Sequence, residues 1–237
     1  MPEYGRLGQD TLAHTSPALA PLYPAPPWPL KNASVMKIAY ETDAAPVLQW
    51  LPPRLSRSAP PYAIVTVARF PDSPVGIFSL AAQHIGCRAG MFVRAFTIQA
   101  VTDNTTALAA LREVWGYPCT LGTIEMDADG LSAAVKDGQG QLLADASIAD
   151  AKPIDPEAIR FDPVLNVRAV PSLEEGRTHD LLQLLQIDPE HEIGESTRGG
   201  GSLKLDGWGV LPVCNVISAV HCTLNTELPL ARFVMPY

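Results

Sequence analysis

Three apolar runs separated by short polar turns are the feature that most constrains the fold of this sequence. The runs are residues 62–70, 75–83 and 91–101, and they are rich in β-branched and aromatic side chains. Pro71-Asp72-Ser73-Pro74 and the segment 86–90 separate them. Runs of this composition, joined by turn residues, are typical of antiparallel strands. We therefore expect a mainly β, α+β protein built on an antiparallel sheet.

The remaining apolar segments extend this pattern. Further strands are expected at residues 35–40, 123–126, 131–136, 141–148, 165–170, 200–205 and 216–221. Asp137-Gly138 is a hairpin signal, and the pattern does not decide between helix and strand for residues 181–187.

Two segments have helical features. Residues 105–115 carry apolar side chains at helical spacing and follow Asn104, which, like Thr105, suits a helix N-cap. A shorter helix over residues 45–51 is expected, capped by Thr42 or Asp43 and ended by Pro52-Pro53.

The first 33 residues differ in character from the rest. Six prolines between positions 17 and 29 exclude regular helix, so residues 1–33 are expected to form an extended arm. Leu22, Tyr23 and Trp28 are candidate anchors for this arm on the body of the protein. Residues 34–237 are expected to form a single domain.

Charge and hydropathy exclude several classes of function. The net charge is −8, the pI is about 5.0 and no basic run occurs, which argues against nucleic acid as a partner. No apolar run approaches the roughly 18–20 residues that span a bilayer. The polar N-terminus lacks a signal-peptide layout, so we expect a cytoplasmic protein that binds no membrane. The four cysteines lack metal-site spacing and are expected to be free thiols, with no metal bound.

One stretch, residues 112–122, carries a distinctive motif. It reads Arg-Glu-Val-Trp-Gly-Tyr-Pro-Cys-Thr-Leu-Gly and resembles the active-site signature of the acetoacetate decarboxylase family, roughly R-E-x-x-x-Y-P-K-K-L-G. Tyr40-Glu41-Thr42-Asp43 resembles the opening of that family, and residues 200–230 resemble its closing third. The resemblance implies a β-rich, cone-like barrel with few helices, and a homo-oligomer. It implies no cofactor.

The motif lacks the lysines on which the activity of the family depends. In the family the first lysine of the signature forms a Schiff base, but Cys119 and Thr120 occupy the lysine positions here. Neither side chain can form an imine. By the same resemblance, Ala33 replaces a substrate-binding arginine, and Thr66 and Leu80 replace two functional glutamates. We therefore expect no acetoacetate decarboxylation.

The other lysines offer poor substitutes. Lys204 alternates with apolar neighbours and is expected to face solvent, whereas Lys136 and Lys152 are expected in loops; Lys31 and Lys37 complete the set.

Two hypotheses about function follow. In the first, the cavity of the family is reused without a Schiff base for a carbonyl-bearing small molecule, in cyclisation, hydration, dehydration or isomerisation of a polyketide-like or enone intermediate. Such reactions need a shaped, dry cavity, an oriented donor for the carbonyl oxygen and a base. In the second, the same cavity binds a small molecule without turnover. Conversion of the bound compound distinguishes the two.

The candidate residues follow from the motif and the strand pattern. We expect catalytic roles for Tyr117, Thr120, Arg94 and Glu113, and ligand contacts from Thr66, Leu80, Gln83, Trp115 and Cys119. Further candidates are Arg69 as a donor, and Glu125 and His84 as bases.

Structural roles are the alternative for these residues. Arg112 and Glu113 could form a buried ion pair, Tyr117 could anchor the turn, and Cys119 could be a cavity wall, since no cation that would lower its pKa is evident. His84 and His221 fit structural roles in strands.

Two further segments are expected to be structural only. Residues 188–195 are acidic but lack calcium or zinc spacing, so we interpret them as a solvated loop. Gly199-Gly200-Gly201 precedes no Lys-Ser pair and is interpreted as a turn.

Overall fold

The computed structural model describes residue 4 and residues 20–237, and most of the described chain lies in one 13-stranded sheet. The predicted arm therefore lies largely outside the described residues. Its last part does not match the prediction, because the first strand, β1 (Trp28–Glu41), begins inside it. Tyr23 and Trp28 are buried as predicted, whereas Leu22 is half exposed.

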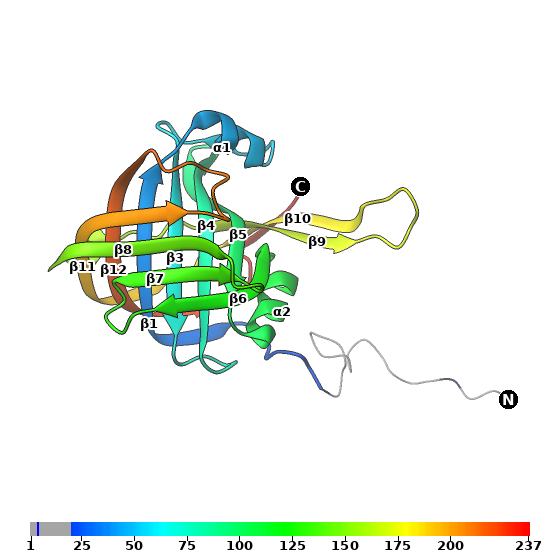
Figure 1. The fold of residues 1–237 in the computed structure, drawn as a ribbon. Coiled ribbons are helices and arrows are strands. Elements are labelled where there is room, and N and C mark those ends of the chain that lie inside the picture. The colour runs from blue at the N-terminus through cyan, green and yellow to red at the C-terminus, as the bar shows by residue number, and fades with distance from the viewer. Residues whose placement is uncertain (1–3, 5–19) are drawn as a thin grey trace.

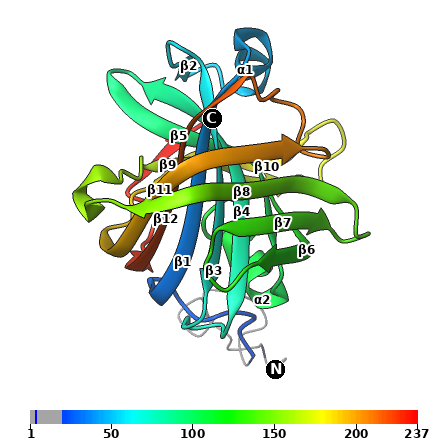
Figure 2. The ribbon, with the colours of Figure 1, turned by 60° about the vertical axis from the view of Figure 1, so that its left-hand side comes forward.

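The sheet closes into a barrel (Figures 1 and 2). The neighbours run β5-β6-β7-β8-β11-β12-β1-β3-β4, and β4 pairs with β5 to close the ring. The strands of the ring are β1, β3 (Tyr62–Phe70), β4 (Phe78–Ala89), β5 (Phe92–Thr102), β6 (Cys119–Met126), β7 (Ser132–Asp137), β8 (Leu142–Pro153), β11 (His191–Leu205) and β12 (Asn215–Leu228). Closure removes the unpaired edges that an open sheet exposes.

The strands outside the ring form a projecting arm. β9 (Val164–Pro171) and β10 (His179–Ile187) form a long hairpin that extends from the barrel (Figure 1). β13 (Phe233–Pro236) pairs with β10, and the two-residue β2 (Ser56–Arg57) pairs with β4. Residues 181–187, left open by the sequence pattern, are therefore strand.

The sheet is antiparallel, as predicted, except at two places. β5 pairs in parallel with both β6 and β9. The chain between β5 and β6 crosses over through α2 (Thr105–Glu113), because parallel neighbours cannot be joined by a tight hairpin. The side chain of Asn104 caps α2 by accepting a hydrogen bond from the backbone of Ala107 at 2.9 Å, as the sequence predicted. The shorter helix, α1 (Ala44–Trp50), is confirmed as well; Asp43 occupies its N-cap position, but its side chain makes no capping hydrogen bond.

Buried side chains pack on both faces of β1, β3 and β4. On one face, Met36, Ile38 and Tyr40 join a cluster that reaches β6, β7 and β8. On the other face, Val35, Ala68 and Ala82 join a cluster with α2, Trp28 and Ile159. The segment between β8 and β9 covers this second face, and contains a 3-10 turn, η2 (Pro156–Ala158). The second face carries the candidate site.

Candidate active site

The signature motif forms the connection between α2 and β6. Gly116 has φ 65°, and a Cβ atom there would lie 2.8 Å from the backbone nitrogen of Arg168, so this turn requires glycine. Arg112 donates from Nη1 to the carbonyl oxygen of Cys119 at 2.8 Å, and the Tyr23 hydroxyl donates to Glu113 at 2.6 Å. The buried Arg112–Glu113 ion pair considered above is therefore absent; both side chains are exposed and stabilise the turn separately.

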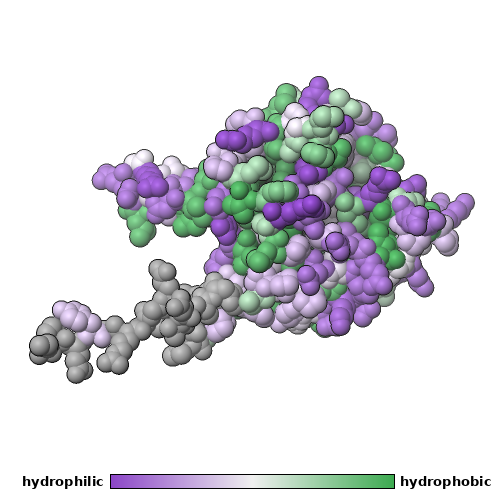
Figure 3. All heavy atoms as spheres, turned by 180° about the vertical axis from the view of Figure 1, so that it is seen from behind, coloured by the Kyte–Doolittle hydropathy of each residue, from purple (hydrophilic) through white to green (hydrophobic). Residues whose placement is uncertain are grey.

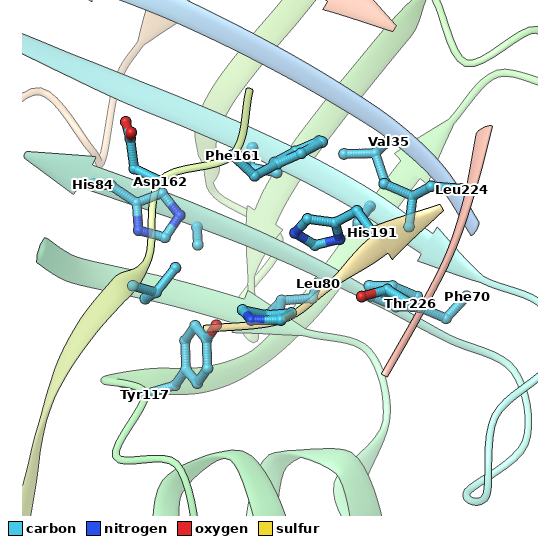
Figure 4. Close-up of a pocket in the computed structure, with 15 residues that line it drawn as sticks. Val35, Phe70, Leu80, His84, Tyr117, Phe161, Asp162, His191, Leu224 and Thr226 are labelled. Atoms are coloured by element: carbon cyan, nitrogen blue, oxygen red, sulfur yellow. The ribbon is translucent and has the colours of Figure 1, made fainter. Parts of the chain in front are cut away.

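An apolar pocket lies next to this turn, between the second face of the sheet and the segment before β9 (Figure 4). Its volume is about 140 Å³. Apolar side chains make most of the wall, namely Val35, Ala68, Phe70, Leu80, Ala82, Phe161, Val164, Pro189 and Leu224. The polar groups in the wall are Thr66, His84, Tyr117, Asp162, His191 and Thr226. No lysine lines it.

His84 is a neutral group in this wall. Burial lowers the pKa of its imidazole to about 3, and the nearby charge of Lys37 acts in the same direction. Its Nδ1 lies 3.0 Å from the hydroxyl oxygen of Thr97, which makes no other hydrogen bond among the described residues. A hydroxyl that donates to Nδ1 leaves the proton of the neutral ring on Nε2. In that tautomer His84 holds an Nε2–H donor that makes no hydrogen bond among the described residues.

His191 is the second neutral imidazole. Burial lowers the pKa of His191 to about 4; Lys37 contributes to this lowering, and Asp188 opposes it. Its ring centre lies 4.5 Å from that of Phe161, and its buried Nδ1 has no hydrogen-bond partner among the described residues. A buried polar atom without a partner is costly, which marks this nitrogen as a candidate contact for a ligand.

Tyr117 completes the polar set. Its side chain points into the pocket (Figure 4), and burial raises the pKa of the phenol to about 12, partly offset by Asn166. The hydroxyl therefore remains a hydrogen-bond donor at neutral pH. Together, Tyr117, His84 and His191 can orient a carbonyl oxygen and exchange a proton without adding charge to the pocket.

Three of the residues predicted from the sequence line this pocket: Thr66, Leu80 and Tyr117. His84, considered there as a base, also lines it. The structure places the other predicted residues elsewhere.

Cys119 and Thr120 do not line the pocket. The Cys119 side chain is fully buried in the same apolar cluster as Tyr117 and Ala82, and burial raises the pKa of its thiol to about 12. Thr120 is the next residue of β6, so its side chain points to the opposite face of the sheet, and it is exposed. Its hydroxyl lies 3.4 Å from the carbonyl oxygen of Ala100. The expected contact of Cys119 with a ligand is thus replaced by packing next to the pocket.

Three other predicted contacts have structural partners. Gln83 is buried on the first face, where it donates to the Tyr40 hydroxyl at 2.7 Å. Trp115 packs edge-on against Trp28 and donates to the carbonyl oxygen of Pro229. Arg94 donates from Nε to the side chain of Gln186 at 3.0 Å.

The remaining donor and base candidates also lie outside the pocket. Glu113 accepts a hydrogen bond from the Tyr23 hydroxyl, and Glu125 forms an exposed ion pair with Lys136. Arg69 is exposed on β3.

The sequence interpretation missed the contributions of two segments. His191 begins β11 and lines the pocket, so the solvated-loop interpretation of this part of residues 188–195 is wrong. Phe161 and Asp162 come from the segment before β9, where no candidate residue was predicted. The pair Phe161-Asp162, an aromatic residue beside an acid in a proline-containing segment, was the only available signal of a contact with a ligand. Nothing in the sequence indicated that this segment lies over the sheet.

The fold and the pocket define a closed β-barrel with a small, mainly apolar cavity that contains a few polar groups. A sequence model described as "Acetoacetate decarboxylase (ADC)" matches residues 13–237, and the chain belongs to this family. Within the described residues, no helix is long and apolar enough to span a membrane.

Individual relatives are distant but cover the whole chain. "Acetoacetate decarboxylase 1" of Mesorhizobium japonicum is 25% identical, over 97% of this chain and 98% of its own. The crystal structure of acetoacetate decarboxylase from Legionella pneumophila superposes with a TM-score of 0.86 at 24% identity, covering 100% of this chain and 99% of that one. The enduracididine biosynthesis enzyme MppR, complexed with pyruvate, gives 0.74 at 16% identity, with 94% and 97% covered. These similarities in structure confirm the predicted fold.

Proposed function

We propose that this chain is an enzyme that acts on a small carbonyl compound in the apolar pocket without forming a Schiff base. The reaction class is proton transfer next to a carbonyl group, as in isomerisation, hydration, dehydration or cyclisation of an enone or polyketide-like intermediate. The observation that carries the proposal is the set of neutral polar groups, Tyr117, His84 and His191, in an apolar pocket that no lysine lines.

The size of the pocket limits the reacting part of the substrate. A cavity of about 150 Å³ holds a molecule the size of benzene, and this pocket measures about 140 Å³. The pocket therefore suits a small enone or β-dicarbonyl compound, or the reacting end of a longer one. The family relationship supports this class, and a protein of this fold is complexed with pyruvate, itself a small carbonyl compound.

The chemistry follows from the protonation states. Tyr117 and His84 donate hydrogen bonds to the carbonyl oxygen. In the tautomer of His191 that carries its proton on Nε2, Nδ1 accepts a proton from the adjacent carbon, the electron pair of the broken C–H bond moves to the oxygen as an enolate, and the proton returns at another carbon. An imidazole with a pKa of about 4 is a weak base. It is best suited to a carbon acid made acidic by two carbonyl groups, because the difference in pKa between the carbon acid and the base is then smallest.

Decarboxylation through an imine is the rival that the names of the relatives suggest. It needs an amine that is unprotonated and in contact with the substrate. Here the signature positions hold Cys119 and Thr120, neither of which lines the pocket. The positions matched to the carboxylates and the arginine of the family hold Thr66, Leu80 and Ala33.

The test is a thermal-stabilisation screen of β-keto acids, enones, lactones and aromatic polyketides, with mass spectrometry to detect conversion. A ligand at about 100 times its dissociation constant adds about 2.7 kcal/mol of stability. We expect at least one compound that stabilises the protein and is isomerised, hydrated, dehydrated or cyclised. Carbon dioxide released from acetoacetate would overturn the proposal in favour of the rival.

A matched pair of variants connects conversion to the pocket. Tyr117→Phe removes the hydroxyl that points into the pocket, whereas Tyr40→Phe removes a buried hydroxyl on the opposite face. Loss of one such donor typically lowers kcat by about a hundredfold or more. We expect that loss for Tyr117→Phe only; equal losses would indicate a general effect of removing a buried hydroxyl.

The second candidate function is binding without turnover, which an apolar pocket with few polar groups also fits. A compound that stabilises the protein through Leu80 and Tyr117 and is recovered unchanged, with no converted compound in the whole panel, would favour it.

A further inference from the structure

A second cavity, distinct from the apolar pocket, lies on the other side of the segment that carries Phe161. Its volume is about 170 Å³. Among the described residues, those that line it are Lys37, Ala39, Ala158, Ile159, Arg160, Arg198, Ser218 and Val220, with no acidic side chain. A cavity walled by cations is unexpected in a chain with a net charge of −8.

Strand register brings its cations together. Val220 on β12 is paired with Lys37 on β1 and with Arg198 on β11, so all three lie on one face of the sheet. Adjacent strands are about 4.8 Å apart, which places the backbones of Lys37 and Arg198 about 10 Å from each other. Figure 2 shows the three strands side by side. Arg160 is added from the covering segment, where its carbonyl oxygen accepts a hydrogen bond from Nζ of Lys37.

The arrangement is unfavourable by itself. Arg198 is also paired directly with Lys152 on β8, and like charges directly opposite each other destabilise a sheet. Burial lowers the pKa of Lys37, although Asp162 and Cys222 oppose this change. Among the described residues, none of Lys37, Lys152, Arg160 and Arg198 forms an ion pair; the pairs that do form involve Lys136, Arg177, Lys204 and Arg232.

We propose that this second cavity is a binding site for an anionic oxygen group, a carboxylate or a phosphate, held by Lys37, Arg160 and Arg198. Guanidinium groups make strong charge-assisted hydrogen bonds to such anions, and the hydroxyl of Ser218 adds a donor from β12. The anion offsets the repulsion between Arg198 and its cationic neighbours. The proposal does not depend on which reaction occurs in the apolar pocket.

The test is calorimetric titration of the full chain with inorganic phosphate and, separately, with acetate. Ionic strength is held constant with chloride, because salt screens exposed charges. Arg160→Gln and Arg198→Gln each remove a guanidinium group that makes no hydrogen bond or ion pair within the described part of the chain, so both variants should fold. Arg54→Gln is the matched control, an exposed arginine outside the cavity that also has no such partner among the described residues. We expect saturable binding at one site, weakened about tenfold or more in the two cavity variants, as loss of a charge-assisted hydrogen bond produces, and unchanged in the control.

A second arm distinguishes the source of the anion. A carbonyl compound that stabilises the protein in the screen is compared as its carboxylate and as its methyl ester. If the anion is part of that ligand, the acid binds more tightly than the ester, and Arg198→Gln removes the difference. If the anion is a separate molecule, phosphate and the ester bind together without competition. Absence of saturable binding by phosphate, acetate and the acid, or equal weakening in Arg54→Gln, would overturn the proposal.

Discussion

The ammonium nitrogen of Lys37 lies 5.2 Å from the centre of the Phe161 ring. Phe161 lines the apolar pocket, and Lys37 lines the cationic cavity, so this cation–π contact forms part of the wall between the two sites. The ring of Phe161 thus lies between the ammonium group of Lys37 and the apolar pocket. The charge of Lys37 nevertheless helps to keep the imidazoles of His84 and His191 neutral.

The cysteine in the signature motif is predicted to be inert. Burial raises the pKa of Cys119 to about 12, and the exposed cysteine among the four is Cys214. Because the thiolate is the reactive form, a thiol reagent should label Cys214 alone in the native protein and all four cysteines after unfolding. Rapid native labelling of Cys119, detected by peptide mass spectrometry, would contradict this assignment.

Truncation of the same residue tests its role in the reaction. Cys119→Ala should change the rate of conversion by less than about tenfold, equivalent to about 1.4 kcal/mol, since the thiol only packs beside the pocket. A loss near a thousandfold would instead identify a nucleophile.

The neutral histidines predict how stability depends on pH. His84 has a folded-state pKa of about 3 against an ordinary value of 6.5, so below pH 6.5 the unfolded chain binds a proton that the folded protein does not. Stability therefore falls as the pH drops below 6.5, by about 2 kcal/mol at pH 5 for this one group. Urea unfolding at pH 7.5 and pH 5 measures the difference.

His84→Gln provides the control for this effect. Glutamine retains a polar group beside Thr97 but does not titrate, so the variant should lose less stability than the wild type between the two pH values. An identical pH dependence in both proteins would show that His84 is not the cause.

Filling the apolar pocket should abolish binding. Leu80→Trp places a bulky ring in the wall of the pocket, at a stability cost of about 1–3 kcal/mol. Ile77→Trp, at a neighbouring position that is 61% exposed, is the control. Compounds that raise the Tm of the wild type should not raise that of Leu80→Trp but should raise that of Ile77→Trp. Retained stabilisation of Leu80→Trp would place the ligand elsewhere.

The expectation of a homo-oligomer remains a prediction. Large apolar side chains are exposed in several regions, among them Met91 and Phe92 at the β4–β5 turn, and Phe233 and Val234 in β13. Figure 3 shows apolar surface near the base of the β9–β10 hairpin. Sedimentation should give a mass that is a multiple of 25.4 kDa, and Phe92→Asp or Phe233→Asp should lower it. A wild-type protein that sediments as a monomer would contradict the expectation.

Local sequence patterns predicted most elements of the fold. Tyr62–Phe70 is a strand with the predicted boundaries, and Asn104 caps α2 as expected. The errors lie where long-range pairing overrides local signals. β4 continues to Ala89 through a segment expected to be a turn, because β5 pairs with it there and β2 pairs with Cys87 and Arg88. The parallel partners of β5 likewise depend on a crossover that no local pattern reveals.

The candidate site was predicted less completely, for a physical reason. The alternation of side chains along the strand places Cys119 on the face that carries the pocket. At that position, however, neighbouring apolar side chains bury Cys119 completely, so it does not reach the pocket. His191 and Phe161 meet only because β11 and the covering segment converge in space. Lys37 was counted among the poor substitutes for the signature lysine, and its contact with Phe161 was not predicted. Contacts between segments so far apart in the chain have no signal in a single sequence.

The most direct measurement of the central claim is borohydride reduction during conversion of a carbonyl compound identified in the screen. Borohydride reduces an imine between a ligand and a lysine to a permanent adduct that intact-mass and peptide analysis detect. We predict no substrate-dependent adduct and unchanged activity, since no lysine lines the pocket. Inactivation with one equivalent of adduct, on Lys37 or any other lysine, would contradict an imine-free reaction.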